Sequence, residues 1–157
     1  MPMDIANLFG FFNQKVNGIN VNLRKGIQAC SGTIATTGNE DEFVVVQEAG
    51  ILDSIDYSGS NSLAVSDTNF ITFTVMNMGQ TGVGTTQMLA PGDVNTTKAT
   101  GGSPLAAHAK RSLVMSSTLA NKFVQAGDRL AIRAAVTGTL PTTIGFPTYM
   151  VRFRGQG

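Results

Sequence analysis

Few residues in this chain have side chains that could carry out acid–base, nucleophilic or metal chemistry. The 157 residues include one histidine, one cysteine, ten carboxylates and no tryptophan. A serine hydrolase needs an imidazole base beside its nucleophile, and His108 lies in a run of alanines with no flanking motif. A zinc site needs three or four His, Cys or acidic ligands, which His108 and Cys30 cannot supply. We therefore expect no catalytic residue, no cofactor, no metal and no enzymatic activity.

Other candidate sites are weak. Asp53 and Asp56 are three positions apart, so on a strand they would face opposite sides and could not act as a carboxylate pair. The loop 79–85 is rich in glycine, but it lacks the lysine that a phosphate-binding loop requires. Asp67 and Asn69 could offer oxygen ligands to Ca²⁺, although no loop has the spacing of a calcium-binding motif. Calcium binding stays open at this stage.

Charge does not favour nucleic acid as a partner. The net charge is +1, so no overall field attracts polyanions. Residues 1–78 hold eight acidic and three basic side chains, whereas 79–157 hold two acidic and eight basic ones. The basic Arg152 and Arg154 alternate with the aromatic Tyr149 and Phe153, which places them on opposite faces of a strand instead of in one stacking groove. The uneven charge instead suits pairing between strands or between subunits.

The composition suits a single soluble domain with an uncharged polar surface. Apolar residues make up 42% of the chain and charged residues only 13%, about half the usual fraction. Uncharged polar groups cost less to desolvate than ions, so such a surface suits packing against neighbours, or it reflects strands rich in Ser and Thr. A single cysteine forms no internal disulfide, which fits synthesis in a reducing cytoplasm. No signal peptide and no membrane-spanning run is evident.

The N-terminal residues carry an apolar stripe with helical spacing. The pattern predicts a short helix over about 4–17, with Asp4 as its cap. Its stripe would be formed chiefly by Ile5, Leu8, Phe9 and Phe12. Leaving these side chains in water wastes roughly 1.5–3 kcal/mol each, so the stripe must be covered. It could pack on its own domain or anchor in a groove of a neighbour; a membrane-surface role is disfavoured because Lys15 is its only basic residue.

The remainder of the chain predicts an all-β fold. We interpret 1–42 as an N-terminal arm, a helix followed by an extended linker that could hold one or two short strands, and 43–157 as an antiparallel, jelly-roll-like β-sandwich. The clearest alternation, typical of a half-buried strand, lies in 69–77. A short helix is expected to begin at Ser103-Pro104 and to continue to Arg111. The expected strands are 43–47, 51–57, 69–77, 86–89, 112–117, 121–124, 129–136 and 149–153.

The order of these segments resembles the head decoration, or cement, proteins of tailed bacteriophages, which are β-sandwich virion proteins. The resemblance covers roughly two thirds of the chain and is a pattern, not a diagnostic motif. Its segments are Gly50 to Ile55, Ile71 to Met76, Gly79 to Gly84, the turn and strand Ala126 to Ile132, and the closing strand Tyr149 to Phe153.

This resemblance implies a structural virion protein that stabilises a capsid by bridging neighbouring capsomers, often through an N-terminal arm. The implied partners are the major capsid protein and further copies of the chain, as a homotrimer or a dimer, with no nucleic acid and no membrane. The implied location is the capsid exterior, after synthesis in the host cytoplasm. The alternative is a fibre, tail or receptor-binding module that binds glycans. Such a module would need exposed loop aromatics, and Phe146 is the candidate.

Overall fold

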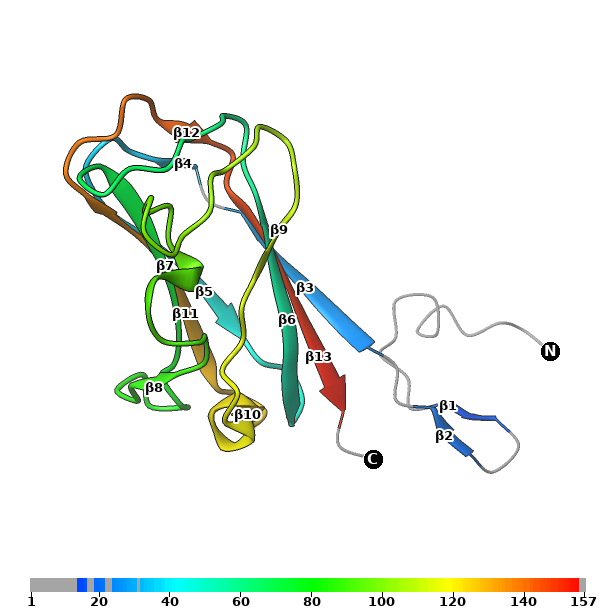
Figure 1. Ribbon diagram of the computed structural model, residues 1–157. Coiled ribbons are helices and arrows are strands. Elements are labelled where there is room, and N and C mark those ends of the chain that lie inside the picture. Colours follow the sequence, from blue (N-terminus) through cyan, green and yellow to red (C-terminus); the bar gives the residue numbers. More distant parts are fainter. Residues whose placement is uncertain (1–13, 17–18, 22–23, 31, 156–157) are drawn as a thin grey trace.

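Two antiparallel sheets pack face to face in the computed structural model, which describes residues 14–16, 19–21, 24–30 and 32–155 (Figure 1). The part of the chain that the structure describes has two short 3₁₀ helices in its connections, η2 (Asp93–Asn95) and η3 (Leu119–Lys122). No helix in these described ranges is long and apolar enough to cross a membrane. The strands are β1 (Gln14–Val16), β2 (Ile19–Val21), β3 (Arg24–Cys30), β4 (Thr33–Ile34), β5 (Gly38–Val45), β6 (Gly50–Ser58), β7 (Phe70–Asn77), β8 (Thr86–Gln87), β9 (Arg111–Leu113), β10 (Phe123–Val124), β11 (Arg129–Thr137), β12 (Ile144–Gly145) and β13 (Thr148–Gly155).

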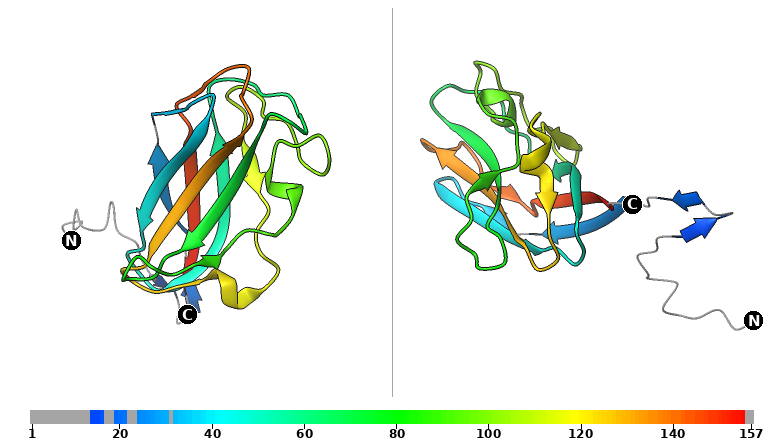
Figure 2. Two further views of the ribbon diagram at one scale, coloured as in Figure 1. Left: turned by 90° about the vertical axis from the view of Figure 1, so that its left-hand side faces the viewer. Right: turned by 90° about the horizontal axis from the view of Figure 1, so that it is seen from below.

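The strand order confirms the predicted jelly-roll-like sandwich. One sheet has the order β10-β6-β13-β3, with β9 also paired to β6, and the other has the order β5-β11-β7-β8. The strands of these two sheets can be renumbered 1 to 8 in chain order, with β9 and β10 counted as one interrupted strand and with the short β1, β2, β4 and β12 left out. In this numbering, the order across one sheet is 6-3-8-1 and across the other 2-7-4-5. This interleaving of early and late strands is that of two Greek keys folded together. Figure 2 shows the two layers from the side and from below.

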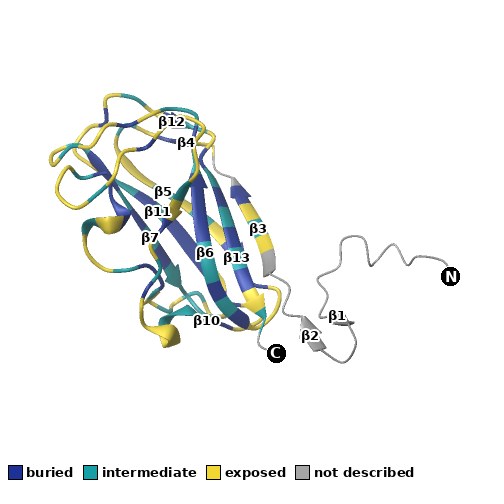
Figure 3. Ribbon diagram, turned by 45° about the vertical axis from the view of Figure 1, so that its right-hand side comes forward, coloured by how far each residue is buried: buried dark blue, intermediate teal, exposed yellow. Residues whose placement is uncertain are grey.

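Alternating side chains build the core between the sheets. In β7, Ile71, Phe73 and Val75 are buried, and the intervening threonines are half-buried, as the alternation predicted. The long central strands are the most buried ones in Figure 3, because neighbours cover both their edges and their inner faces. The rings of Tyr57 and Tyr149 lie at the centre, 5.5 Å apart, and both are almost fully buried. Burial of apolar surface between two sheets is the main stabilising term in such a fold.

The N-terminal helix prediction differs from the structure at the end of the expected helix. Residues Gln14–Val16 were expected to end a helix, but they form strand β1, paired antiparallel with β2. The sequence between these strands is Asn17-Gly18, the pair that two-residue hairpin loops favour, and β-branched residues flank it. The predicted helix residues before Gln14 lie outside the described residues.

The expected linker and domain boundary also need correction. Strand β3 pairs with β13 along its whole length, and β5 pairs with β11 from Gly38 to Val45. A boundary after residue 42 would therefore cut through β5. These two strands gave a weak sequence signal because each lies at the edge of its sheet. Edge strands expose polar and charged side chains that protect them from unwanted pairing.

The expected helix over 103–111 is absent from the described part of the chain. Leu105 instead forms a β-bridge with Leu63, and a turn follows at Ala107 and His108. Arg111 then starts β9, where its guanidinium donates to the carbonyls of Ser103 and Thr96. The long-range bridge and these hydrogen bonds override a local preference that rested on a single Ser-Pro start signal.

Candidate functional site

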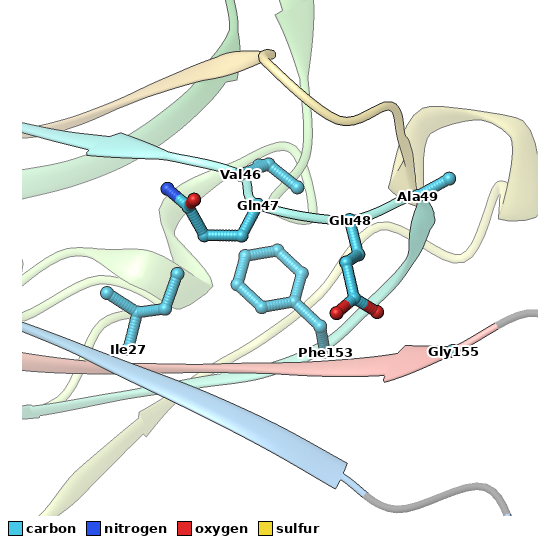
Figure 4. Close-up of a pocket in the computed structure, with 7 residues that line it drawn as sticks. All are labelled: Ile27, Val46, Gln47, Glu48, Ala49, Phe153 and Gly155. Carbon is cyan, nitrogen blue, oxygen red and sulfur yellow. The ribbon is translucent and has the colours of Figure 1, made fainter. Parts of the chain in front are cut away.

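An apolar hollow lies at the end of the sandwich where β3 begins and β13 ends. Figure 4 shows the Phe153 ring rising from β13 toward the segment that joins β5 to β6, with Ile27 of β3 beside it. Val46 closes the hollow on the side of that segment. The complete lining is Ile27, Val46, Gln47, Glu48, Ala49, Phe153 and Gly155.

Backbone contacts hold the connecting segment over the hollow. The Val46 N–H donates to the Asp128 carbonyl over 2.8 Å, and the Gly127 N–H donates to the Val46 carbonyl over 2.8 Å. Gly50 then approaches β13 closely, since a Cβ atom there would lie 2.7 Å from the Arg154 carbonyl oxygen. Only glycine fits such an approach, so the start of β6 is fixed against β13.

The hollow is too small for a substrate. Its accessible space is about 30 Å³, room for one or two water molecules or for the end of one apolar side chain. Ligand-binding clefts are far larger and combine apolar walls with convergent polar groups. The hollow therefore suits a contact with another polypeptide segment.

Exposed apolar side chains lie on the outer face of β5, just before the segment that lines the hollow. Phe43 is 60% exposed and Val45 is 50% exposed, while Val44 between them is buried. In the sheet, Phe43 lies opposite Ala131, which in turn lies opposite Met76. Strand β5 has β11 as its one neighbour in the described sheet. We call the hollow together with Phe43 and Val45 the β5-edge surface.

Acidic side chains follow this surface along β5. The Asp41 carboxylate accepts two hydrogen bonds from the guanidinium of Arg133, at 2.6 and 2.7 Å, and these bonds lower the pKa of Asp41. Glu40 and Glu42 lie on the opposite face of the strand and are half-buried. Burial, followed by the charge of Glu40, raises the pKa of Glu42. Charged groups at an edge disfavour indiscriminate strand pairing, so they narrow the partners that this edge can accept.

At the opposite end of the sandwich lie two residues with aromatic side chains whose backbone is in a rare conformation. Phe146 and His108 have φ values of 48° and 58°, in the left-handed region that ordinary residues avoid. Phe146 is 79% exposed. The His108 N–H donates to the Gly59 carbonyl and the Ser60 N–H donates to the Gly145 carbonyl, so one short segment supports both residues. Such strain often accompanies a functional surface. We call Phe146 and His108 the loop rim.

A third polar cluster lies on the outer face of the β6–β13 sheet. Asp56 is only 6% exposed, and its carboxylate accepts hydrogen bonds from Ser112, at 2.6 Å, and from Arg152. Lys110 lies 3.7 Å away. Burial alone would raise the pKa of Asp56, but the hydrogen bonds from Ser112 and Arg152 and the nearby positive charges lower it. Every charge in this cluster is partnered, so it stabilises the sheet and presents no reactive group.

The side chains predicted as the partner anchor, Ile5, Leu8, Phe9 and Phe12, lie outside the described residues. Within the described ranges, no three His, Cys, Asp or Glu side chains gather as a metal site would require. Asp67 is engaged by the backbone N–H and hydroxyl of Thr100. The amide oxygen of Asn69 accepts from the Thr139 N–H. Both possible calcium ligands therefore tie loops together.

Sequence reasoning missed the β5-edge surface and the strain at the loop rim. The run Phe43-Val44-Val45-Val46 is continuously apolar, so its composition did not reveal which members face outward. The acidic residues just before this run were the feature of the sequence that indicated an edge strand. The expected alternation in β13 is confirmed, because Tyr149 and Phe153 are buried whereas Arg154 is exposed.

Comparison with known proteins gives little further guidance. No protein-family profile matches the chain, and no curated protein sequence matches it. Among solved structures, a chain of the cyanophage Pam1 capsid asymmetric unit aligns over 99% of this chain and 100% of its own length. The sequence identity is 16% and the TM-score is 0.47. A likeness this distant carries no argument about what the chain does.

Proposed function

We propose that this chain is a structural virion protein of a tailed bacteriophage that decorates the head and stabilises it by bridging neighbouring capsomers. Its partners would be the major capsid protein and other copies of itself, as a homotrimer or a dimer. It would lie on the capsid exterior after synthesis in the host cytoplasm, and it would need no cofactor, nucleic acid or membrane. The sequence resemblance described above supports this role.

The β5-edge surface is the structural observation that carries the proposal. Phe43 and Val45 are exposed on an edge strand, and an apolar hollow lies beside the segment that follows this strand. Full burial of side chains of this kind contributes about 1.5–3 kcal/mol each. A protein partner that covered Phe43, Val45 and the hollow would gain this energy, provided that its own charges matched the acidic side chains of β5.

In the proposed mechanism, the N-terminal stripe attaches the chain to a partner and the sandwich holds neighbouring capsomers together. The apolar stripe Ile5, Leu8, Phe9 and Phe12 would anchor in a second polypeptide, while the sandwich would rest on the shell. Each sandwich then resists separation of the two capsomers that it contacts, because moving them apart would expose the buried apolar surface again. No bond is made or broken in this role.

Co-sedimentation with phage heads tests the proposal. The probe is a head assembled from the major capsid protein of the same virus and lacking this chain. We expect the intact chain to pellet with such heads and Phe43→Ser to bind at least about tenfold more weakly, the loss of one well-buried aromatic contact. Val83→Ser is the matched control, since Val83 is 78% exposed on the loop between β7 and β8. An intact chain that stays in the supernatant would refute the function.

The second candidate is a receptor-binding module that recognises glycans, and the loop rim favours it. Phe146 offers an exposed aromatic face, and the neighbouring loops supply neutral amide and hydroxyl groups such as Asn61 and Thr142. Saturable binding on a glycan array, lost in Phe146→Ala, would promote this candidate over decoration. A blank array would remove it.

A further inference from the structure

We propose that the β5-edge surface receives the apolar stripe, Ile5 to Phe12, of a second copy of this chain. This inference rests on the proposed function, in which the stripe binds in trans, and it names the trans partner. Copies of the chain would then be joined by exchanged N-terminal segments before or while they bind the head.

The β5-edge surface offers two contact areas for the side chains of such a segment. The hollow beside Phe153 has room for the end of one apolar side chain. On the outer face of β5, Phe43 and Val45 offer a second contact area. The stripe has four large apolar side chains, which is too many for the hollow alone. A segment that passes around the strand edge would place one of them in the hollow and others against Phe43 and Val45.

The chain path brings the stripe to the correct end of the sandwich. In the β1–β2 hairpin, Gln14 pairs with Val21. Three residues further on, Arg24 pairs with Arg154, next to Gly155 at the rim of the hollow. Three residues can span at most about 10 Å. The segment that precedes Gln14 therefore starts near the end of the sandwich that carries the hollow.

The direction of the hairpin favours exchange between copies. Figures 1 and 2 show β1 and β2 beyond the end of β3, outside both sheets. A segment that continues from Gln14 thus begins outside its own sandwich, where a neighbour can meet it. Exchange around a closed ring of two or three copies gives every hollow an occupant and leaves no unpaired stripe.

Disulfide trapping between differently tagged chains tests the exchange. All chains carry Cys30→Ser, which removes the single native thiol. One population carries Phe11→Cys, which lies off the stripe and leaves its four members in place, and a second carries Gln47→Cys, an exposed position at the hollow. Thr139→Cys is the control partner, because it is also exposed but follows the far end of β11. After mixing and mild oxidation, we expect interchain cross-links with Gln47→Cys and their loss with Thr139→Cys.

Three results would overturn the inference. Equal cross-linking to both positions, or none to either, would show that the stripe does not bind this surface. A chain carrying both Phe11→Cys and Gln47→Cys that closes on itself at dilute concentration, with no interchain product, would show binding in cis. Head co-sedimentation of the same proteins separates the two claims. Head binding without cross-links refutes only the exchange, whereas loss of head binding by the unsubstituted chain refutes the proposed function.

Discussion

Asp56 and Arg152 form a diagonal ion pair across the central strands of one sheet. Met150 lies directly opposite Asp56 on β13, and Arg152 lies two residues further along, where its guanidinium reaches back to the carboxylate. Ser112 on β9 donates to the other carboxylate oxygen. One buried acid thus joins three neighbouring strands, β9, β6 and β13.

Replacing this acid should weaken the sandwich. Asp56→Asn keeps the size of the side chain but removes the charge that holds Arg152, and we expect a loss of about 1–3 kcal/mol in the free energy of unfolding. Urea denaturation measures it. Asp41→Asn, which breaks a solvent-accessible ion pair with Arg133 on β5 and β11, is the control and should cost less than about 1 kcal/mol. Equal effects of the two substitutions would contradict this account of the cluster.

The contribution of Asp56 should also appear in the pH dependence of the free energy of unfolding. The pKa of Asp56 is lower in the folded protein than in the unfolded chain, where an aspartate titrates near 3.9. Its contribution is therefore fully present above about pH 4 and is lost as the pH falls through the folded pKa. Unfolding curves for the natural chain and Asp56→Asn should converge in that acid range. A difference that stays constant down to the lowest accessible pH would argue against this linkage.

Two glycines in the left-handed region should differ sharply when replaced by alanine. At Gly138 (φ 72°) a Cβ atom would lie 2.3 Å from the Thr68 carbonyl oxygen and from the Asn69 amide oxygen. At Gly79 (φ 65°) no atom lies within 4 Å. We expect Gly79→Ala to cost about 1 kcal/mol from backbone strain alone and Gly138→Ala about 3 kcal/mol or more. Thermal unfolding of both variants checks this order, and similar costs would contradict it.

Truncation should locate the N-terminal edge of the sandwich. A chain that lacks residues 1–22 retains every strand of both sheets, so we expect cooperative unfolding within about 1 kcal/mol of the full chain. A chain that lacks residues 1–42 loses β3, β4 and most of β5, and it should show no cooperative transition. Calorimetry distinguishes the two. Cooperative unfolding of the shorter chain would restore the boundary after residue 42 that the sequence suggested.

The sequence predicted the central strands well because their alternation reflects burial on one face. Ile71, Phe73 and Val75 show this in β7, and Leu130 and Ile132 show it in β11. These strands have neighbours on both edges, so their inner faces must be apolar. The local pattern and the three-dimensional environment therefore agree.

Edge strands and loop conformations could not be predicted in the same way. Strand β3 has few large apolar residues because one sheet edge is open, and Glu40 and Glu42 made β5 resemble a solvated linker. Their pairing partners, β13 and β11, lie about a hundred residues away in the chain. The left-handed backbone at Phe146 depends on hydrogen bonds to distant loops, so no local signal marks it.

The central claim is that a second polypeptide covers the apolar stripe, and head binding by stripe variants tests it most directly. Phe9→Ser combined with Phe12→Ser removes two members of the stripe, and Phe11→Ser, which lies off the stripe, is the matched control. We predict that the double variant keeps its free energy of unfolding within about 0.5 kcal/mol and no longer pellets with phage heads, while the control still binds. A double variant that binds heads normally, or that loses several kcal/mol of stability on its own, would contradict the claim.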